Sequence, residues 1–286
     1  MFDARDPYER RMWHYESWRP LSIAQIIAAG SVDAETAGLL WVLIEHRASL
    51  IVAGPTDPMP DVGKTTTLNA LLDFLPEDTM LAYCAGMWER FDFLKVAVPE
   101  RTCVICNEVS DHLPIYMWGR VAQRLLMLPQ QGYMVATTVH ADTVSDVIAM
   151  LAHDVGVPIA DLRRLGLVIN IGLVGRVYPP RRRFLTVHFL RPTLPACAES
   201  KVEVLQLAAW NARTDTFSRP STATLDELAR WAGMDVAELT GAVQRRAAAL
   251  ARLAADAGQG MRSTRRAIAA LRAAESRSTT EGNTEA

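Results

Sequence analysis

Apolar residues fall along this chain in two kinds of segment: short uninterrupted runs, and longer stretches in which they recur every three or four positions. Uninterrupted runs are typical of strands buried on both faces, and they occur at 48–54, 80–84, 102–107 and 133–139. Helical spacing predicts helices at 23–29, 34–46, 64–75, 115–127 and 143–153. Ser31 and Asp33 are candidate N-caps of the second helix. The alternation of the two kinds predicts an α/β fold with a doubly wound parallel sheet.

The pattern changes beyond about residue 160. Two extended segments, 165–174 and 184–190, are joined by 175–183, whose Pro-Pro pair and arginines are typical of a solvated hairpin connection. They predict a small antiparallel appendage, and 202–210 predicts one more strand. From about residue 222 the chain reads as helical, with an apolar face made by Leu239, Val243, Ala247, Leu250 and Ala254.

Composition and charge narrow the classes of function. Half of the 286 residues are hydrophobic and 22% are charged, which is ordinary for a globular protein. The formal net charge of −2 gives no overall positive field, so we expect no nucleic-acid partner. The N-terminus lacks an apolar signal segment, and no run of about 18 uncharged apolar residues occurs. We therefore expect a cytoplasmic protein, neither exported nor membrane-spanning.

The four cysteines, Cys84, Cys103, Cys106 and Cys197, are too few and too scattered for a disulfide framework, and they lack the second ligand pair of a zinc site. A reducing compartment is the natural expectation. Cys103 and Cys106 form a lone CxxC inside an apolar run, where buried strand residues are more common than redox or metal chemistry. We assign them to packing.

The segment GPTDPMPDVGKTTT, at 54–67, follows an apolar strand and opens a helix, the context of a phosphate-binding loop. Lys64 would reach the β and γ phosphates, and Thr65 would hold Mg²⁺. The spacing departs from the standard motif, because eight residues rather than four separate Gly54 from Gly63. The alternative is an acidic surface loop before a Thr-rich helix start. In the inserted stretch, prolines remove N–H donors and aspartates add negative charge, at Asp57, Pro58, Pro60 and Asp61.

Two further strands end in polar residues, where open α/β sheets place catalytic groups. The strand at 102–107 leads into Glu108, which could polarise an attacking water or order water on Mg²⁺. The strand at 133–139 leads into His140, which could lie beside a γ-phosphate. Each also has a plain alternative: Glu108 as a solvated residue at a strand end, and His140 as a hydrogen-bonded structural residue.

Segments 19–54 and 63–76 resemble the core of archaeal-type secretion and archaellum-motor ATPases, in the superfamily of type II/type IV secretion and type IV pilus motors. The resemblance extends over about 19–273. It implies a RecA-like P-loop NTPase core that uses ATP and Mg²⁺. The family's phosphate-binding loop, catalytic glutamate and histidine motif of the form TTxHAD match Gly63, Lys64, Thr65, Glu108 and His140. On this basis nucleotide contacts fall to Gly54, Gly63, Lys64, Thr65 and Thr66, the metal to Thr65 and Glu108, and catalysis to Glu108 and His140.

Three features depart from the family's pattern. Cys84, Ala85 and Gly86 stand where the family carries an acidic pair after its second strand, and Ser110 replaces an arginine two residues after the glutamate. The phosphate-binding loop carries the insertion. The family's separate N-terminal domain is absent here or reduced to a short arm.

The resulting domain expectation is a lead-in arm (1–20), a RecA-like nucleotide-binding core (21–200), a C-terminal strand and helical subdomain (201–274) and a disordered tail (275–286). The resemblance implies an ATPase motor subunit for pilus assembly or protein secretion. Its partners would be a homo-hexamer, or a mixed ring with a related ATPase, and a membrane platform protein. The altered motifs leave open a catalytically impaired paralogue that serves such a motor as a structural or regulatory subunit.

A third possibility is a RecA-like ATPase that depends on nucleic acid. Short basic clusters at 163–164 and 181–183 would support it, although clusters this short are usually solvated faces.

Overall fold

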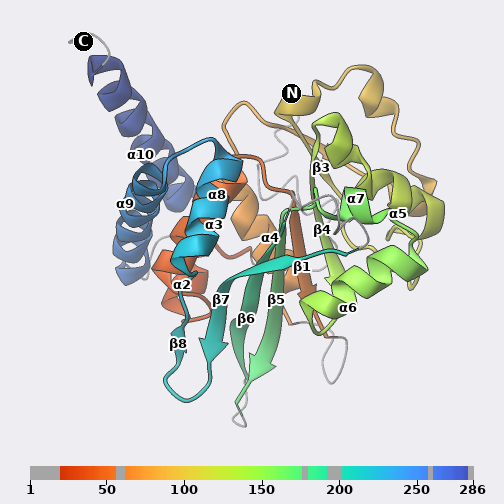
Figure 1. Cartoon of the computed structure of the whole chain (residues 1–286), viewed down its shortest axis with the longest axis horizontal. Coiled ribbons are helices and arrows are strands. Elements are labelled where there is room, and N and C mark those ends of the chain that lie inside the picture. The colour runs from red at the N-terminus through yellow and green to blue at the C-terminus, as the bar shows by residue number, and fades with distance from the viewer. Residues whose placement is uncertain (1–19, 56–61, 176–179, 192–200, 257–259, 283–286) are drawn as a thin grey trace.

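Eight strands in the order β2-β3-β4-β1-β5-β6-β7-β8 form one sheet at the centre of this computed structural model (Figure 1). The structure describes residues 20–55, 62–175, 180–191, 201–256 and 260–282. The first five strands in that order are mutually parallel: β2 (Met80–Tyr83), β3 (Thr102–Ile105), β4 (Met134–His140), β1 (Leu50–Gly54) and β5 (Leu167–Val174). The last three are antiparallel to their neighbours: β6 (Arg181–Leu190), β7 (Val204–Asn211) and β8 (Thr216–Phe217). The parallel part confirms the predicted α/β sheet.

Helices and short turns connect the parallel strands. After β1 come α4 (Lys64–Leu71) and the 3-10 turn η1 (Leu72–Phe74), and after β3 come α5 (Gly119–Leu126) and η5 (Leu128–Gln131). Between β2 and β3 lie three 3-10 turns, η2 (Gly86–Trp88), η3 (Asp92–Lys95) and η4 (Pro99–Arg101). After β4, α6 (Val144–Ala149) passes into the π-helical turn η6 (Met150–Asp154), followed by α7 (Ile159–Leu162). The helices predicted at 115–127 and 143–153 are therefore present but shorter or less regular.

The predicted antiparallel hairpin exists as β5 and β6, but it is not an appendage. β5 pairs with β6 on one side and in parallel with β1 on the other, so it lies inside the main sheet. The reason is burial: its first six residues are buried, as in a central strand. β7 continues the same sheet through its pairing with β6.

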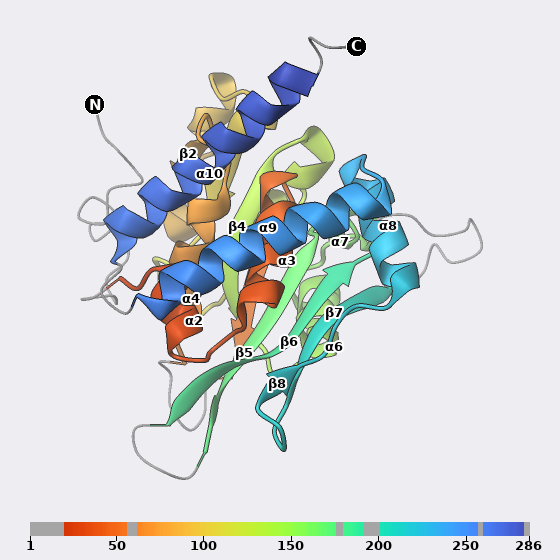
Figure 2. The same ribbon diagram turned by 90° about the vertical axis from the view of Figure 1, so that its left-hand side faces the viewer.

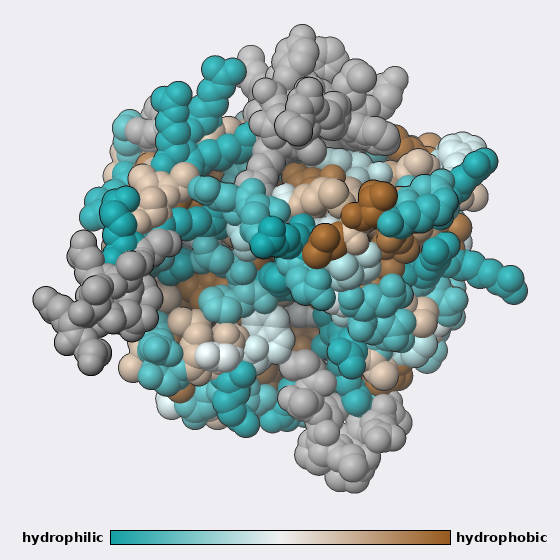
Figure 3. All heavy atoms as spheres, turned by 90° about the horizontal axis from the view of Figure 1, so that it is seen from above, coloured by the Kyte–Doolittle hydropathy of each residue, from teal (hydrophilic) through white to brown (hydrophobic). Residues whose placement is uncertain are grey.

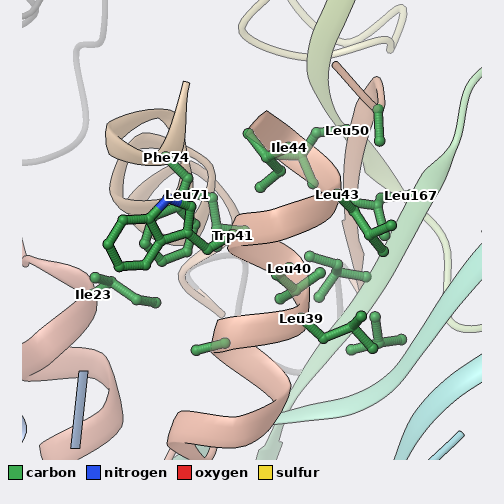
Figure 4. Packing of buried hydrophobic residues seen from close by; sticks show 14 of the residues in the cluster. Ile23, Leu39, Leu40, Trp41, Leu43, Ile44, Leu50, Leu71, Phe74 and Leu167 are labelled. Carbon is green, nitrogen blue, oxygen red and sulfur yellow. The ribbon is translucent and has the colours of Figure 1, made fainter. Parts of the chain in front are cut away.

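Residues of β1 alternate between two hydrophobic cores, which explains why this strand reads as an unbroken apolar run. Leu50 and Val52 face one core, while Ile51 and Ala53 face the other. On the first face, α2 (Ile23–Ala28) and α3 (Ala34–Glu45) pack with α4. Trp41 of α3 stacks on Phe74, with ring centroids 5.1 Å apart and planes 4° from parallel (Figure 4). Asp33 caps α3 by accepting a hydrogen bond from the Thr36 amide, as one of the two predicted N-caps.

Three C-terminal helices complete the first face: α8 (Thr222–Ala232), α9 (Val236–Ala255) and α10 (Met261–Gly282). α9 lies across α3 in the turned view (Figure 2), and Leu239 and Leu250 of its predicted apolar face are fully buried there. The strand and helices of 201–256 thus share the sheet and the core with the preceding residues. α10 continues past residue 274, so the described part of the expected disordered tail is helical.

Among the described residues, no helix combines the length and the apolar character needed to cross a membrane. The arrowhead of β5 points down in Figure 1, so Figure 3, seen from above, looks onto the edge where the parallel strands begin. That face is mainly hydrophilic, with a small group of hydrophobic residues near its centre (Figure 3). The polar strand ends predicted as a site lie at the opposite edge.

Candidate functional site

The register of the parallel strands brings the predicted polar residues together at the carboxyl edge of the sheet. Gly54, the last residue of β1, pairs with His140, the last residue of β4. Just beyond β3, Val109 forms a parallel bridge with Val139, which places Glu108 beside the end of β4. The phosphate-loop strand, the glutamate and the histidine therefore meet because β1 and β4 end at one level and the segment that follows β3 continues alongside β4 to that level.

The start of α4 has the geometry expected of an anion-binding helix end. Gly63 is its N-cap, with φ of 94°, a left-handed conformation that favours glycine. Gly63 offers no side chain to cap the first turn, and the first amides of a helix have no acceptor within the helix itself. Lys64 is the first helical residue and is buried, while Thr65 and Thr66 in the same turn are half-buried.

The end of β1 is so closely packed that Gly54 cannot be replaced by a larger residue without a clash. A Cβ at Gly54 would lie 2.8 Å from Cγ2 of the buried Val62 and 3.0 Å from the Ile171 carbonyl oxygen. The chain therefore folds back tightly over the end of β1 before α4 begins. The inserted residues Asp57, Pro58, Pro60 and Asp61 lie outside the described part of the chain.

Lys64, His140 and Glu108 form a buried ion cluster. Lys64 Nζ lies 2.9 Å from His140 Nδ1 and 3.5 Å from Glu108 Oε2, and His140 Nε2 lies 2.9 Å from Glu108 Oε1. The side chains of Lys64 and Glu108 are 6% and 7% exposed. An ammonium group has only protons to donate, so His140 accepts from Lys64 through a ring nitrogen, while its Nε2 lies within ion-pair distance of Glu108. One imidazole thus links the cation to the carboxylate.

Glu108 is held as a carboxylate by this cluster. Burial by itself would raise its pKa, but the hydrogen bond from His140 and the positive charge of Lys64 outweigh burial and lower the pKa below its usual value. Thr138 adds a hydroxyl 3.4 Å from Glu108 Oε2 and also donates to the Asn107 carbonyl oxygen at 2.8 Å. The site therefore contains a desolvated negative charge next to a desolvated positive one.

Ser110 and His112 lie beside the cluster, and His112 is a residue that the sequence did not single out. The His112 ring packs edge-on to the His140 ring with centroids 5.6 Å apart, and Ser110 Oγ is hydrogen-bonded to His112 Nδ1. Ser110 was predicted only as the substitute for the family's arginine. The available signal for His112 was its position four residues after Glu108, in the loop that returns along β4.

The turn after β2, where the sequence has Cys84, Ala85 and Gly86, is held by a nearby glutamate. At the end of β2, the Ala85 amide donates to Glu89 Oε2 at 2.7 Å, and the Phe91 amide donates to the other oxygen of that carboxylate. Glu89 therefore serves the turn that follows β2. Cys84, Ala85 and Gly86 themselves supply no carboxylate there.

The described cysteines pack in the interior. Cys103 and Cys106 are fully buried, and burial raises the pKa of each thiol to about 12. Thiolate chemistry at neutral pH requires a lowered pKa, so these positions suit packing and not redox work. No group of three metal-ligating His, Cys, Asp or Glu side chains occurs within the described residues.

The donor set fits a phosphate ester with a hard divalent cation. The amides of a helix's first turn and a lysine suit a polyphosphate, and a threonine hydroxyl with a carboxylate suits Mg²⁺, which prefers oxygen ligands. Lys64, Thr65 and Thr66 would contact the nucleotide, and Thr65 and Glu108 would hold the metal or its water. All five predicted nucleotide positions are described, and the structure gathers Gly54, Gly63 and Lys64 at one place with Glu108 and His140.

Comparison with known proteins identifies distant relatives. No protein-family model matches the chain. The uncharacterized protein MJ0900 of Methanocaldococcus jannaschii is 27% identical over 176 residues, which cover 52% of this chain but only 30% of that protein. The uncharacterized protein MJ1287 of the same organism is 26% identical over 222 residues, covering 67% of this chain and 76% of that protein. Among solved structures, the Legionella pneumophila ATPase DotB aligns with 72% of this chain and 55% of its own, at 15% identity and a TM-score of 0.34.

Proposed function

We propose that this protein binds Mg²⁺-ATP at the start of α4 and hydrolyses it. The observation that carries the proposal is the Lys64–His140–Glu108 cluster, assembled from three chain segments beside a helix N-terminus whose N-cap is a glycine. A purely structural surface loop would not need a desolvated lysine and glutamate at that place, because burying charges is costly.

Each residue has a defined task in this proposal. The amides of Gly63 to Thr66 and the ammonium group of Lys64 bind the phosphates, and Thr65 ligates Mg²⁺. The metal, when bound, neutralises phosphate charge and favours loss of the terminal phosphoryl group. Glu108 orients and polarises the attacking water, since its lowered pKa keeps it ionised at neutral pH. His140 bridges Glu108 and Lys64, so it responds to a γ-phosphate that draws Lys64 away.

The wider role we propose is that of a motor subunit for pilus assembly or protein secretion. It would act in the cytoplasm as a homo-hexamer, or in a mixed ring with a related ATPase, against a membrane platform protein. The support is the resemblance of residues 19–273 to such motors together with the intact lysine, glutamate and histidine at the site.

A specific observation favours a second candidate, a catalytically impaired paralogue that tunes a competent ATPase. Cys84, Ala85 and Gly86 replace the acidic pair, and Ser110 holds His112 where the family has an arginine. The loss of these charges would lower turnover without removing the phosphate-binding residues. Binding and hydrolysis must therefore be measured separately.

The deciding experiment measures ATP binding by calorimetry with Mg²⁺ and phosphate release by a coupled assay. For an active enzyme we expect Lys64→Ala to weaken ATP binding at least tenfold, because a charge-assisted contact is lost. Glu108→Gln should retain ATP binding and lower kcat by about 100-fold or more, the usual scale for removing a general base. Lys95→Ala is the matched control, since Lys95 is exposed and paired only locally with Asp92.

The outcomes separate the candidates. Tight binding without turnover supports the impaired paralogue. Absence of binding at millimolar ATP would rule out both nucleotide-binding proposals, and turnover that survives both site variants would contradict the roles assigned here.

A further inference from the structure

Arg182 lies directly against the glycine that begins α4. A Cβ placed on Gly63 would lie 3.3 Å from both Cδ and Nε of Arg182. Arg182 comes from β6, far along the chain from Gly63, and it is exposed to solvent. A guanidinium group is therefore delivered to the first turn of α4 by a strand outside the phosphate-loop motif.

The flanking residues Arg181 and Arg183 approach a different group, the carboxylate of Asp215. Arg183 is buried and binds Asp215 with two hydrogen bonds of 2.9 Å, and it lies over the Trp210 ring. Arg181 is 74% exposed and lies 4.0 Å from the same carboxylate. Alternate residues of a strand share a face, so the shared approach of Arg181 and Arg183 to Asp215 follows from the strand. Arg182, between them, is the one directed at Gly63.

The order of strands in the sheet determines on which side of β1 Arg182 lies. In the sheet, β3 and β4 lie on one side of β1 and carry Glu108 and His140 at their ends. β5 and β6 lie on the other side and carry Arg182. A polyphosphate across the start of α4 would then have the Glu108–His140 pair at one end and Arg182 at the other.

We propose that Arg182 binds the nucleotide at the α- and β-phosphate end, opposite the reacting phosphate. This inference rests on the proposed nucleotide site and adds a ligand to it. The terminal phosphate belongs next to Glu108, so the phosphates that ATP and ADP share lie toward Arg182. Arg182 should therefore contribute affinity for both nucleotides and leave the chemical step unchanged.

The test compares wild type, Arg182→Ala, Arg182→Lys and the neighbour control Arg181→Ala. Dissociation constants for Mg²⁺-ATP and ADP come from calorimetry, and kcat and KM come from phosphate release. Arg182→Ala should weaken both nucleotides by about tenfold or more, the scale of one charge-assisted contact. KM should rise in parallel while kcat stays within twofold, and Arg182→Lys should recover part of the affinity. Arg181→Ala should bind like wild type.

Several results would overturn the inference while the proposed function stands. These are unchanged affinity in Arg182→Ala, an equal loss in Arg181→Ala, a loss restricted to ATP, or a lower kcat at unchanged affinity. If Arg182→Ala does not fold, Arg182→Gln gives the same readouts with most of the side-chain stem retained. Wild type that binds neither nucleotide would instead overturn the proposed function itself.

Discussion

Glu108 stays ionised inside the protein because its neighbours replace water. Its pKa is lowered by His140 and Lys64 against the effect of burial. A carboxyl group whose pKa is lower in the folded than in the unfolded chain stabilises the fold above the unfolded pKa, near 4.5, and loses that contribution as pH falls. The charge to which we assign a catalytic role is thus also a source of stability.

The corresponding prediction concerns acid unfolding. We expect the free energy of unfolding of wild type minus that of Glu108→Gln to be constant from pH 7 to about 5.5 and to decrease as the pH falls below 4.5. The measurement is urea unfolding at a series of pH values. A difference that grows on acidification would show that Glu108 has a raised pKa and that the cluster does not hold its charge.

Residue identities at the site were predictable to different degrees. Lys64, Glu108 and His140 could be found because each follows a strand pattern, and parallel strands end at a common edge. Arg182 and Arg183 could not be assigned. Their roles depend on which way each side chain leaves β6 and on a distant partner, Gly63 for one and Asp215 for the other. Three consecutive arginines in a sequence do not indicate the direction of each side chain or its distant partner.

At the scale of elements, α3 and α9 approach so closely that one position between them must be glycine. A Cβ at Gly38 would lie 2.9 Å from the Ala247 amide nitrogen and 2.9 Å from the Val243 carbonyl oxygen. Both are backbone atoms of α9, so no side-chain rotation relieves the clash. The apolar stripe predicted for this helix is correct, and its tight contact with α3 depends on Gly38.

We therefore expect Gly38→Ala to destabilise the fold by about 1–3 kcal/mol through overpacking. The matched control is Gly241→Ala in α9, where the added Cβ meets only the flexible end of Arg245 at 3.3 Å. There the same change should be neutral or stabilise by up to about 1 kcal/mol, because alanine favours helix. Chemical denaturation measures both variants, and equal effects would contradict the close approach of the two helices.

The sheet was predictable only in part for a similar reason. Alternating strands and helices predict parallel pairing locally, as they do for β3 and β4. The place of β5 between β1 and β6 depends on pairing over more than a hundred residues, which periodicity does not encode. The antiparallel strands were therefore recognised, but their membership of the main sheet was not.

At the scale of the whole molecule, charged contacts hold α10 against one element before the phosphate loop and one after it. Arg265 pairs with the buried Asp73 at 2.9 Å. Arg272 pairs with Glu45 at 2.6 Å and donates to the Phe74 carbonyl oxygen at 2.7 Å, with its guanidinium over the Trp41 ring. The C-terminal helix is thus bound to the end of α3 and to η1.

Loss of these contacts of α10 should measurably lower the free energy of unfolding. We expect Arg272→Ala to lower the free energy of unfolding by about 1–3 kcal/mol, since it leaves a partly buried carboxylate and a carbonyl group less well satisfied. Arg277→Ala, at an exposed position of the same helix, should change stability by less than about 0.5 kcal/mol. Thermal and denaturant unfolding test this, and equal effects of the two variants would contradict the contact.

The order of strands across the sheet has a consequence for how such proteins are recognised and engineered. In the nucleotide site proposed here, Lys64, Glu108 and His140 come from the parallel strands and their connections, whereas Arg182 comes from a hairpin more than a hundred residues after the GKTTT signature. A fragment that ends before this hairpin would keep the whole phosphate-loop motif but would lack the contact proposed for Arg182. Grafting or swapping experiments should therefore carry the hairpin along with the loop.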